Sequence, residues 1–154
     1  MRRGFGLIQA LMVIVLISGL MMVVMKYAKY SIKQTKDLYI RESAELFMNS
    51  AVELSLLAIQ GYERNSTNHC LNEINITSSD QRFTAEVNVT DYYLLQGSND
   101  STICSGGSGY SVHDIQTEDS HGMVMLEIEV DTNNSNPRNR GKHIRLLRRT
   151  LQRP

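Results

Sequence analysis

Two cysteines and five Asn-x-Ser/Thr tripeptides carry most of the chemistry available to this chain. Cys70 and Cys104 both lie in polar segments that are rich in Ser, Asn and Gly. In an oxidising compartment such a pair forms one disulfide, here closing a loop of about 35 residues and adding about 3–4 kcal/mol of stability. In a reducing compartment both remain free thiols, and the sequence leaves the two states open.

The Asn-x-Ser/Thr tripeptide is the acceptor pattern for N-linked glycosylation. Four of the five examples also carry an acidic residue two positions before the asparagine, a longer pattern that resembles the acceptor of bacterial N-glycosylation systems. In an Asn- and Thr-rich chain, chance is a serious rival explanation, and several of the sites fall in predicted strands. The candidate glycosylation sites are Asn65, Asn75, Asn88 and Asn133; the fifth tripeptide begins at Asn99.

The remaining polar side chains do not form a recognisable catalytic or metal-binding pattern. The four histidines, at positions 69, 113, 121 and 143, lack metal-ligand spacing. His113-Asp114 and the SGGSG segment imitate fragments of hydrolase motifs without the strand–turn–helix context that such motifs need. Asp131-x-Asn133-x-Ser135 resembles the start of a calcium loop, but Lys142 stands where the loop needs glutamate. We therefore expect no catalytic residues, no metal and no cofactor.

A long apolar segment lies at the start of the chain, and it determines where the rest of the protein lies relative to a membrane. From Phe5 to Met25 the strongly polar side chains are Gln9 and Ser18 alone. These residues, as a helix, rise about 30 Å, the thickness of a bilayer's hydrocarbon core. The run exceeds the roughly 7–15 apolar residues of a cleaved signal peptide, and lysines follow it in place of a small-residue cleavage site. We predict a single-pass transmembrane helix over residues 5–25.

The residues around the start of this helix, Arg2–Gln9, resemble the N-terminus of type IV prepilins and type II secretion pseudopilins. Those proteins have a short basic leader ending in glycine, then Phe-Thr/Ser-Leu-Ile-Glu and an apolar helix. Gly4, Phe5, Leu7 and Ile8 match that pattern. The resemblance implies that residues 1–4 are a leader, that a membrane prepilin peptidase cuts between Gly4 and Phe5, and that the new amino terminus on Phe5 is methylated.

Two positions depart from the family pattern: Gly6 replaces its Ser/Thr, and Gln9 replaces its glutamate. In the family, that glutamate pairs with the N-terminal ammonium group of a neighbouring subunit during filament assembly. Gln9 keeps a hydrogen-bond acceptor but has no charge, so it binds an ammonium group more weakly. Family members without the glutamate tend to be minor subunits, notably at a filament tip. The resemblance therefore implies a minor subunit whose partners are other pilin or pseudopilin subunits and an assembly platform.

Beyond the membrane segment, the pattern predicts a longer helix followed by strands. Residues 26–61 continue as an amphipathic helix that ends at Gly61, with apolar residues at helical spacing: Ile32, Tyr39, Ile40, Ala44, Phe47, Ala51, Leu54 and Ala58. Strands are predicted over 83–95, 123–130 and 142–150, and loops over 62–81 and 97–111. The expected fold is α+β and pilin-like, with a long N-terminal helix, transmembrane in its first half, packed on a small antiparallel sheet.

Charge is distributed unevenly along a chain whose net charge is zero. Residues 65–137 hold eleven acidic residues and one basic residue, Arg82, whereas residues 138–154 hold seven basic residues and no acid. Pairing of the last strand with the strand that carries Glu127 and Glu129 explains this pattern. Complementary surfaces on stacked subunits are an alternative. Arginines without interleaved aromatic residues are weak evidence for nucleic-acid binding, so we do not expect a nucleic-acid partner.

The predicted organisation is a leader at 1–4, a transmembrane helix at 5–25, an amphipathic helix at 26–61 and a β-rich head at 62–154. Lys26, Lys29, Lys33 and Lys36 alone would place the head in the cytoplasm. The cysteines, the sequons and the family resemblance favour a periplasmic head, anchored in the bacterial inner membrane. The predicted function is a minor subunit of a pilus-like assembly for secretion, DNA uptake or adhesion. The alternative is a signal-anchored periplasmic binding module or enzyme unrelated to pili.

Overall fold

A computed structural model describes residues 5–117, 121–133, 136, 139 and 143–154. The chain forms two compact units, residues 1–40 and 41–154. Helix α1 (Phe5–Gly61) begins in the first unit and ends in the second, which also holds the sheet. The other elements are β1 (Glu73–Thr77), β2 (Phe83–Leu95), α2 (Asn99–Cys104), β3 (Ser111–Ile115), β4 (Met123–Thr132) and β5 (Arg145–Gln152). A long helix with a small sheet confirms the α+β prediction.

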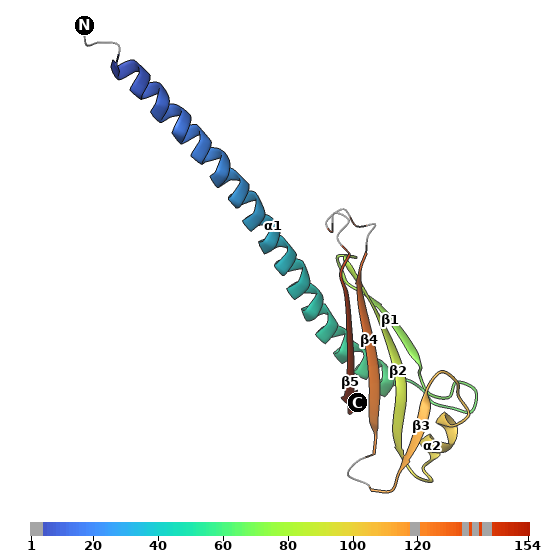
Figure 1. Ribbon diagram of the computed structural model, residues 1–154. Helices are drawn as coiled ribbons and strands as arrows, with labels where there is room; N and C mark the ends of the chain where they lie inside the picture. The colour runs from blue at the N-terminus through green and yellow to red at the C-terminus, as the bar shows by residue number, and fades with distance from the viewer. Residues whose placement is uncertain (1–4, 118–120, 134–135, 137–138, 140–142) are drawn as a thin grey trace. The chain divides into compact units, whose positions relative to one another are not determined.

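Strand β2 is the centre of the sheet (Figure 1). Strand β4 pairs with one edge of β2, and β5 pairs with the far edge of β4. The other edge of β2 is shared by two short strands: β1 lies along Thr84–Asn88, and β3 lies along Asp91–Leu95. Every pair is antiparallel except β2–β3, which is parallel. The predicted antiparallel sheet is therefore correct apart from one short parallel strand.

In β2 and β4, buried and more exposed residues alternate, which shows the side of the sheet that faces the core. In β4 every second residue from Val124 to Thr132 is buried. In β2 the buried positions change from odd to even numbers, from Phe83–Val89 to Tyr92 and Leu94. The pairing register shifts between Val89 and Asp91, which marks a β-bulge. A bulge adds one residue to a strand, so it returns Tyr92 to the core side that Val89 occupies.

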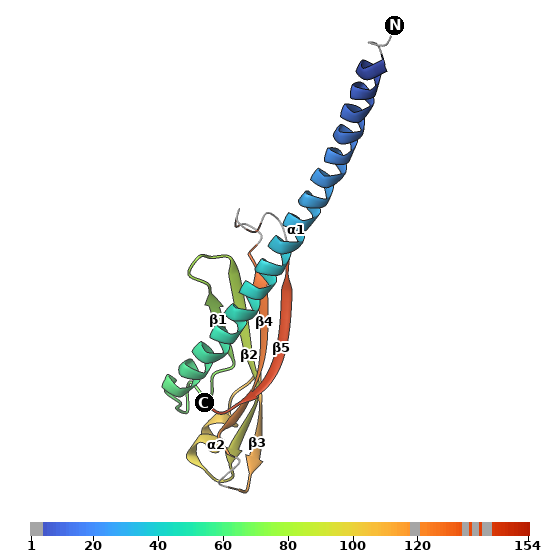
Figure 2. The same cartoon turned by 90° about the vertical axis from the view of Figure 1, so that its left-hand side faces the viewer.

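The last five turns of α1 cover one face of the sheet, and Figure 2 shows this part of the helix crossing the strands. Its buried face is formed by Ala44, Met48, Ala51, Ser55 and Ile59, all at most 2% exposed. Spacings of three or four residues place these side chains on one side of a helix. Three of them, Ala44, Ala51 and Ser55, are small. The predicted stripe was partly wrong: Ile40, Ala44 and Ala51 are buried, but Ile32, Tyr39 and Leu54 are exposed.

Three elements lie where the sequence predicts loop. Strand β1 falls within residues 62–81, helix α2 falls within 97–111, and β3 begins at Ser111. Ser98 is the N-cap of α2, and its hydroxyl accepts a hydrogen bond from the backbone N–H of Ser101 at 3.1 Å. Such Asn-, Ser- and Gly-rich stretches are typical of loops. Pairing with β2 therefore determines the conformation of β1 and β3 more than local preference does.

Strand β5 confirms the expected charge pairing. It lies beside β4, with Arg149 opposite Glu127 and Arg145 opposite Asp131. Arg145 forms an ion pair with Glu129, and that hydrogen bond raises the pKa of the Arg145 guanidinium. Leu147 and Leu151 point away from the core and are 64% and 47% exposed. The basic C-terminal segment thus neutralises acidic residues on the neighbouring strand.

Ala51→Leu tests the contact between α1 and the sheet. Ala51 is fully buried, so three added carbons overpack the interface, and we expect a loss of about 1–3 kcal/mol in the free energy of unfolding. The neighbouring change Ser50→Leu falls on an exposed position and should leave stability within about 0.5 kcal/mol of the wild type. Urea denaturation of the full chain in detergent measures both. Equal losses in the two variants would contradict the described helix face.

Candidate functional site

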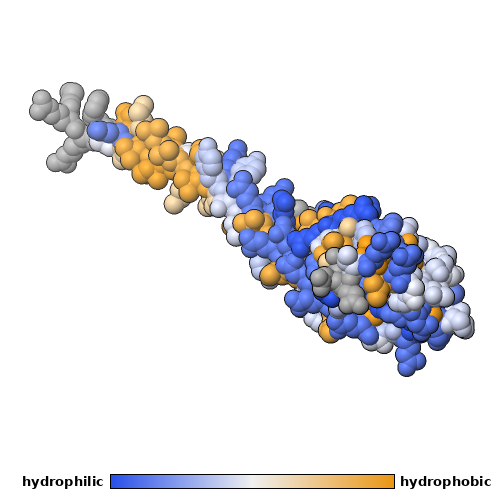
Figure 3. Space-filling view, turned by 90° about the horizontal axis from the view of Figure 1, so that it is seen from below, coloured by the Kyte–Doolittle hydropathy of each residue, from blue (hydrophilic) through white to orange (hydrophobic). Residues whose placement is uncertain are grey.

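The first half of α1 presents an apolar surface that none of the other described residues covers. Gly4 lies outside the described residues, and α1 begins at Phe5. The large hydrophobic side chains from Leu7 to Met25 are 48–71% exposed, and this segment is almost uniformly hydrophobic in Figure 3. The helix is long and apolar enough to cross a membrane. Leaving so many apolar side chains in water is unfavourable, by about 1.5–3 kcal/mol for each large residue. The segment therefore needs lipid or other helices around it.

The two polar side chains within this surface differ in their hydrogen bonds. Ser18 donates its hydroxyl to the carbonyl oxygen of Ile14, one turn earlier, at 2.7 Å. Gln9 is exposed, and its amide makes no hydrogen bond to any of the described residues. In an apolar environment an unpaired amide is costly. Gln9 is therefore the position in this segment where a polar partner from another molecule would be most stabilising.

Cys70 and Cys104 form a disulfide in the head, with their Cα atoms 5.0 Å apart. Both cysteines are buried, at 5% and 0% exposure. The bond joins the segment after α1 to the end of α2. The Tyr110 hydroxyl accepts a hydrogen bond from the Cys70 backbone N–H and donates one to the Cys104 carbonyl, both at 3.0 Å. His69 adds a third link, because its Nδ1 donates to the Ile103 carbonyl at 2.9 Å.

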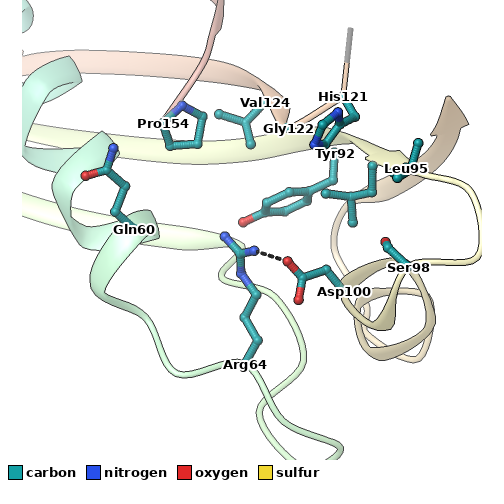
Figure 4. Close-up of a pocket in the computed structure, with 11 residues that line it drawn as sticks. Gln60, Arg64, Tyr92, Leu95, Ser98, Asp100, His121, Gly122, Val124 and Pro154 are labelled. Carbon is teal, nitrogen blue, oxygen red and sulfur yellow. Dashed lines mark hydrogen bonds and ion pairs between the residues drawn. The ribbon is translucent and has the colours of Figure 1, made fainter. Parts of the chain in front are cut away.

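A pocket of about 340 Å³ lies between the end of α1, β2, α2 and the C-terminal residues (Figure 4). Arg64 Nη1 contacts Asp100 Oδ2 at 2.9 Å across it. The Tyr92 hydroxyl donates to the Leu71 carbonyl, and burial raises the pKa of this phenol. Ser98 is occupied as the cap of α2. These four polar side chains already have partners, and their contacts link the segment after α1 with β2 and α2.

Asp91, which follows the β-bulge directly, organises a polar cluster on the outer side of the sheet. Its Oδ1 lies 2.9 Å from His113 Nε2 and its Oδ2 lies 3.3 Å from Arg149 Nη2. The Thr90 hydroxyl also donates to Oδ2, at 2.8 Å. The His113 ring stacks on Tyr93, with centroids 5.1 Å apart. Hydrogen bonds from His113 and Thr90 hold the pKa of the Asp91 carboxyl below its usual range.

In the imitated hydrolase motif, His113 and Asp114 have different partners. Asp114 does not orient His113; it accepts a hydrogen bond from the buried Ser101 hydroxyl at 2.6 Å. Asp131 lies 3.3 Å from His143 Nε2, which gives it a basic neighbour. Ser135 and Lys142 of the calcium-like segment lie outside the described residues. Among the residues that are described, no group of three or more His, Cys, Asp or Glu side chains is arranged to hold a metal ion.

The candidate glycosylation sites occupy different environments. Asn65 lies in the exposed loop after α1. Asn75 and Asn88 lie in strands, and each donates its amide to the acid two residues before it, Glu73 and Glu86, at 2.7 and 3.1 Å. The Asn133 amide donates to the Gln81 carbonyl at 3.1 Å. The side chains of a strand alternate between its two faces, so the spacing of two places each acid beside its asparagine.

Sequence reasoning did not find the Asp91 cluster or the Arg64–Asp100 ion pair. Asp91 and Arg149 lie 58 positions apart and on non-adjacent strands, and Arg64 and Asp100 lie 36 apart. No spacing rule relates residues so distant. The available signal was weak: Asp91 is an acid within a predicted strand, and the β-bulge that turns its side chain outward is not visible in the sequence.

Comparison with models of protein families, with curated proteins and with solved structures finds no match for this chain. The interpretation of its function therefore depends on its own residues.

Asp91→Asn tests the cluster through its pH dependence. The pKa of the Asp91 carboxyl is lower in the folded state than in the unfolded chain. The charged carboxylate therefore stabilises the fold fully above the unfolded pKa of about 3.9, and this stabilisation disappears as the pH falls through the folded pKa. At pH 7 we expect the variant to be about 1–3 kcal/mol less stable. Its free energy of unfolding should also fall less steeply below pH 4. Glu53→Gln, at an exposed helix position, is the matched control. Parallel pH profiles for Asp91→Asn and the wild type would refute the role of Asp91.

Proposed function

We propose that this chain is a minor pilin-like or pseudopilin-like subunit of a pilus-like assembly that serves secretion, DNA uptake or adhesion. A prepilin peptidase removes residues 1–4 by cutting between Gly4 and Phe5. Residues 5–25 anchor the subunit in the bacterial inner membrane, with the head, residues 62–154, in the periplasm. Its role is mechanical: the subunit leaves the bilayer, its helix packs against neighbouring subunits, and its head presents a surface.

The continuity of α1 carries this proposal. One helix runs from Phe5 to Gly61, exposed and apolar in its first half and buried on one face in its last turns. An ordinary signal anchor needs no such continuity, because a flexible linker serves equally well between a membrane helix and a folded domain. A subunit that packs its helices in a filament and carries its head on the same helix does need it. The Arg2–Gln9 motif at the start of the helix supports the same interpretation.

Gln9 favours the role of a minor subunit in such an assembly. Its amide is without a hydrogen-bond partner among the described residues, so a neighbouring polar group would stabilise it. A glutamine attracts an ammonium group less strongly than a carboxylate does. A subunit at a filament tip has no neighbour above it to capture, and there the loss of charge is tolerated.

The head contributes to the proposal in two ways. The Cys70–Cys104 disulfide favours an oxidising exterior and therefore a periplasmic head. Three arginines of the pocket and of β5 already have partners: Arg64 contacts Asp100, Arg145 contacts Glu129 and Arg149 contacts Asp91. These contacts favour a binding or packing role over catalysis. They also reduce the positive charge that β5 would offer to a nucleic acid, so nucleic acid is not among the proposed partners.

Removal of the host's prepilin peptidase tests the proposal directly. We expect a form of the protein four residues longer, with the unprocessed sequence Met1–Gly4, to accumulate in the membrane. In the unmodified host the mature chain should begin at a methylated Phe5. Intact-mass spectrometry of the purified protein distinguishes the two forms. A mass that is the same in both hosts would support an ordinary signal-anchored protein instead.

The abundance of the subunit tests the role of Gln9. In filaments purified from the natural host, quantitative mass spectrometry should find this chain at a small fraction of the major subunit. Gln9→Glu restores the charge and should leave incorporation equal or increase it. Gln9→Leu removes the acceptor and should reduce incorporation. If this chain proved to be the most abundant subunit, the minor role would be wrong.

A further inference from the structure

We infer that Asn65 is a site of N-linked glycosylation, and that its Nδ2 takes an oligosaccharide from a lipid-pyrophosphate donor on the outer side of the membrane. The inference depends on the exterior placement of the head that is proposed above, but not on filament assembly. It selects one asparagine from the five Asn-x-Ser/Thr tripeptides of the chain.

A transferase that modifies folded protein must reach two groups at once, the asparagine amide and the hydroxyl two residues later. It must also bind the peptide between them, which requires a segment that is not part of a sheet or helix. An acidic residue two positions before the asparagine extends the acceptor pattern. The five tripeptides can therefore be compared on the exposure and the hydrogen bonds of these groups.

The tripeptide Asn65-Ser66-Thr67 satisfies each of these requirements. Residues 65–68 are all exposed and lie in a turn outside any helix or strand. Asn65 Oδ1 accepts hydrogen bonds from the backbone N–H groups of Thr67 and Asn68, at 2.9 and 2.8 Å. Within the described part of the chain, neither Asn65 Nδ2 nor the Thr67 hydroxyl has a partner. Both reactive groups are thus free, and Glu63 supplies the preceding acid.

The turn is held at both ends while its tip projects into solvent. On one side, Arg64 is tied to Asp100 at 2.9 Å (Figure 4). On the other side, Cys70 is tied to Cys104 by the disulfide. The backbone N–H of His69 donates to the Asn65 carbonyl at 2.9 Å and closes the turn. The glycan would therefore be attached to an exposed loop whose two ends are held in place, and it would not disturb the core.

The two tripeptides in strands do not meet the requirements. Asn75 and Asn88 donate their amides to Glu73 and Glu86, and their backbones are part of the β1–β2 ladder. In the second of these tripeptides, the Thr90 hydroxyl donates to Asp91. In each folded strand, the acid that completes the acceptor pattern thus accepts a hydrogen bond from the asparagine amide that would carry the glycan.

The remaining two tripeptides are blocked in other ways. Asn99 is the first residue of α2, and the hydroxyl of its tripeptide belongs to Ser101, which is 8% exposed and hydrogen-bonded to Asp114. Gly97, and not an acid, stands two residues before Asn99. The Asn133 amide is held by the Gln81 carbonyl, and Ser135 lies outside the described residues.

The transfer itself is a substitution at the first carbon of the sugar. Asn65 Nδ2 forms a bond to that carbon, the bond between the carbon and the pyrophosphate oxygen breaks, and the lipid pyrophosphate leaves with the bonding electrons. Nδ2 gives up one proton to a base of the transferase or to water. Neither oxidant nor reductant is needed, and the donor is a lipid-pyrophosphate-linked oligosaccharide.

The test is the intact mass of the full chain produced in a bacterium that carries an N-glycosylation system with an oligosaccharide of known mass. We expect a fraction of the protein to gain the mass of one oligosaccharide. Asn65→Gln and Thr67→Ala should each abolish this shift, whereas Thr67→Ser should retain it. Asn75→Gln and Asn88→Gln are the matched controls and should leave it unchanged.

The same spectrum separates failure of this inference from failure of the proposed function. Leader removal appears as loss of Met1–Gly4, and disulfide formation appears as failure of Cys70 and Cys104 to react with an alkylating reagent. Absence of the oligosaccharide from a protein with an oxidised cysteine pair overturns the inference. A shift that survives Asn65→Gln, or a head that remains on the cytoplasmic side, overturns it equally. A glycosylated chain that retains residues 1–4 supports the inference and contradicts the prepilin assignment.

Discussion

Residues 7–25 of α1 present apolar side chains that nothing else in the described chain covers, and this constraint determines what the rest of the molecule must be. At about 1.5–3 kcal/mol for each large side chain, the unfavourable exposure exceeds the 5–15 kcal/mol that stabilise a typical folded protein. The segment is therefore compatible with a bilayer or with a bundle of similar helices, and not with water. Near its start, the unsatisfied amide of Gln9 adds a polar requirement that a neighbouring chain can meet.

The head, in contrast, has an apolar core of its own and internal partners for many of its charged side chains. Ala44, Ala51 and Ser55 lie on the buried face of α1. The Cys70–Cys104 disulfide joins the two segments that the sequence predicts as loops, 62–81 and 97–111. On the outer face, arginines of β5 neutralise carboxylates of β2 and β4. The turn at Asn65 remains accessible, since residues 65–68 are all exposed.

The hydrophobic pattern of the sequence predicted the elements whose buried residues repeat regularly within one segment. The apolar run from Phe5, the alternation in β2 and β4, and the end of α1 at Gly61 were all visible in the sequence. Strands β1 and β3 were missed because they are short and polar, and pairing with β2 stabilises them. The helix face was placed incorrectly because Tyr39 and Leu54 are apolar but exposed, while Ser55 is polar but buried and donates to the Val52 carbonyl. The Asp91 cluster depends on a β-bulge and on contacts between strands, which no single-segment pattern contains.

Amide hydrogen exchange on the full chain, reconstituted in lipid nanodiscs, tests the central claim that one uninterrupted helix serves both membrane and head. The account predicts slow exchange from about Leu7 through the buried turns near Ile59, with no fast-exchanging break between them. It also predicts that lipid removal into a mild detergent at low concentration accelerates exchange in residues 7–25 while the head residues remain protected. Rapid exchange of residues 7–25 in the nanodisc, or a fast-exchanging segment between Met25 and Ala44, would contradict it.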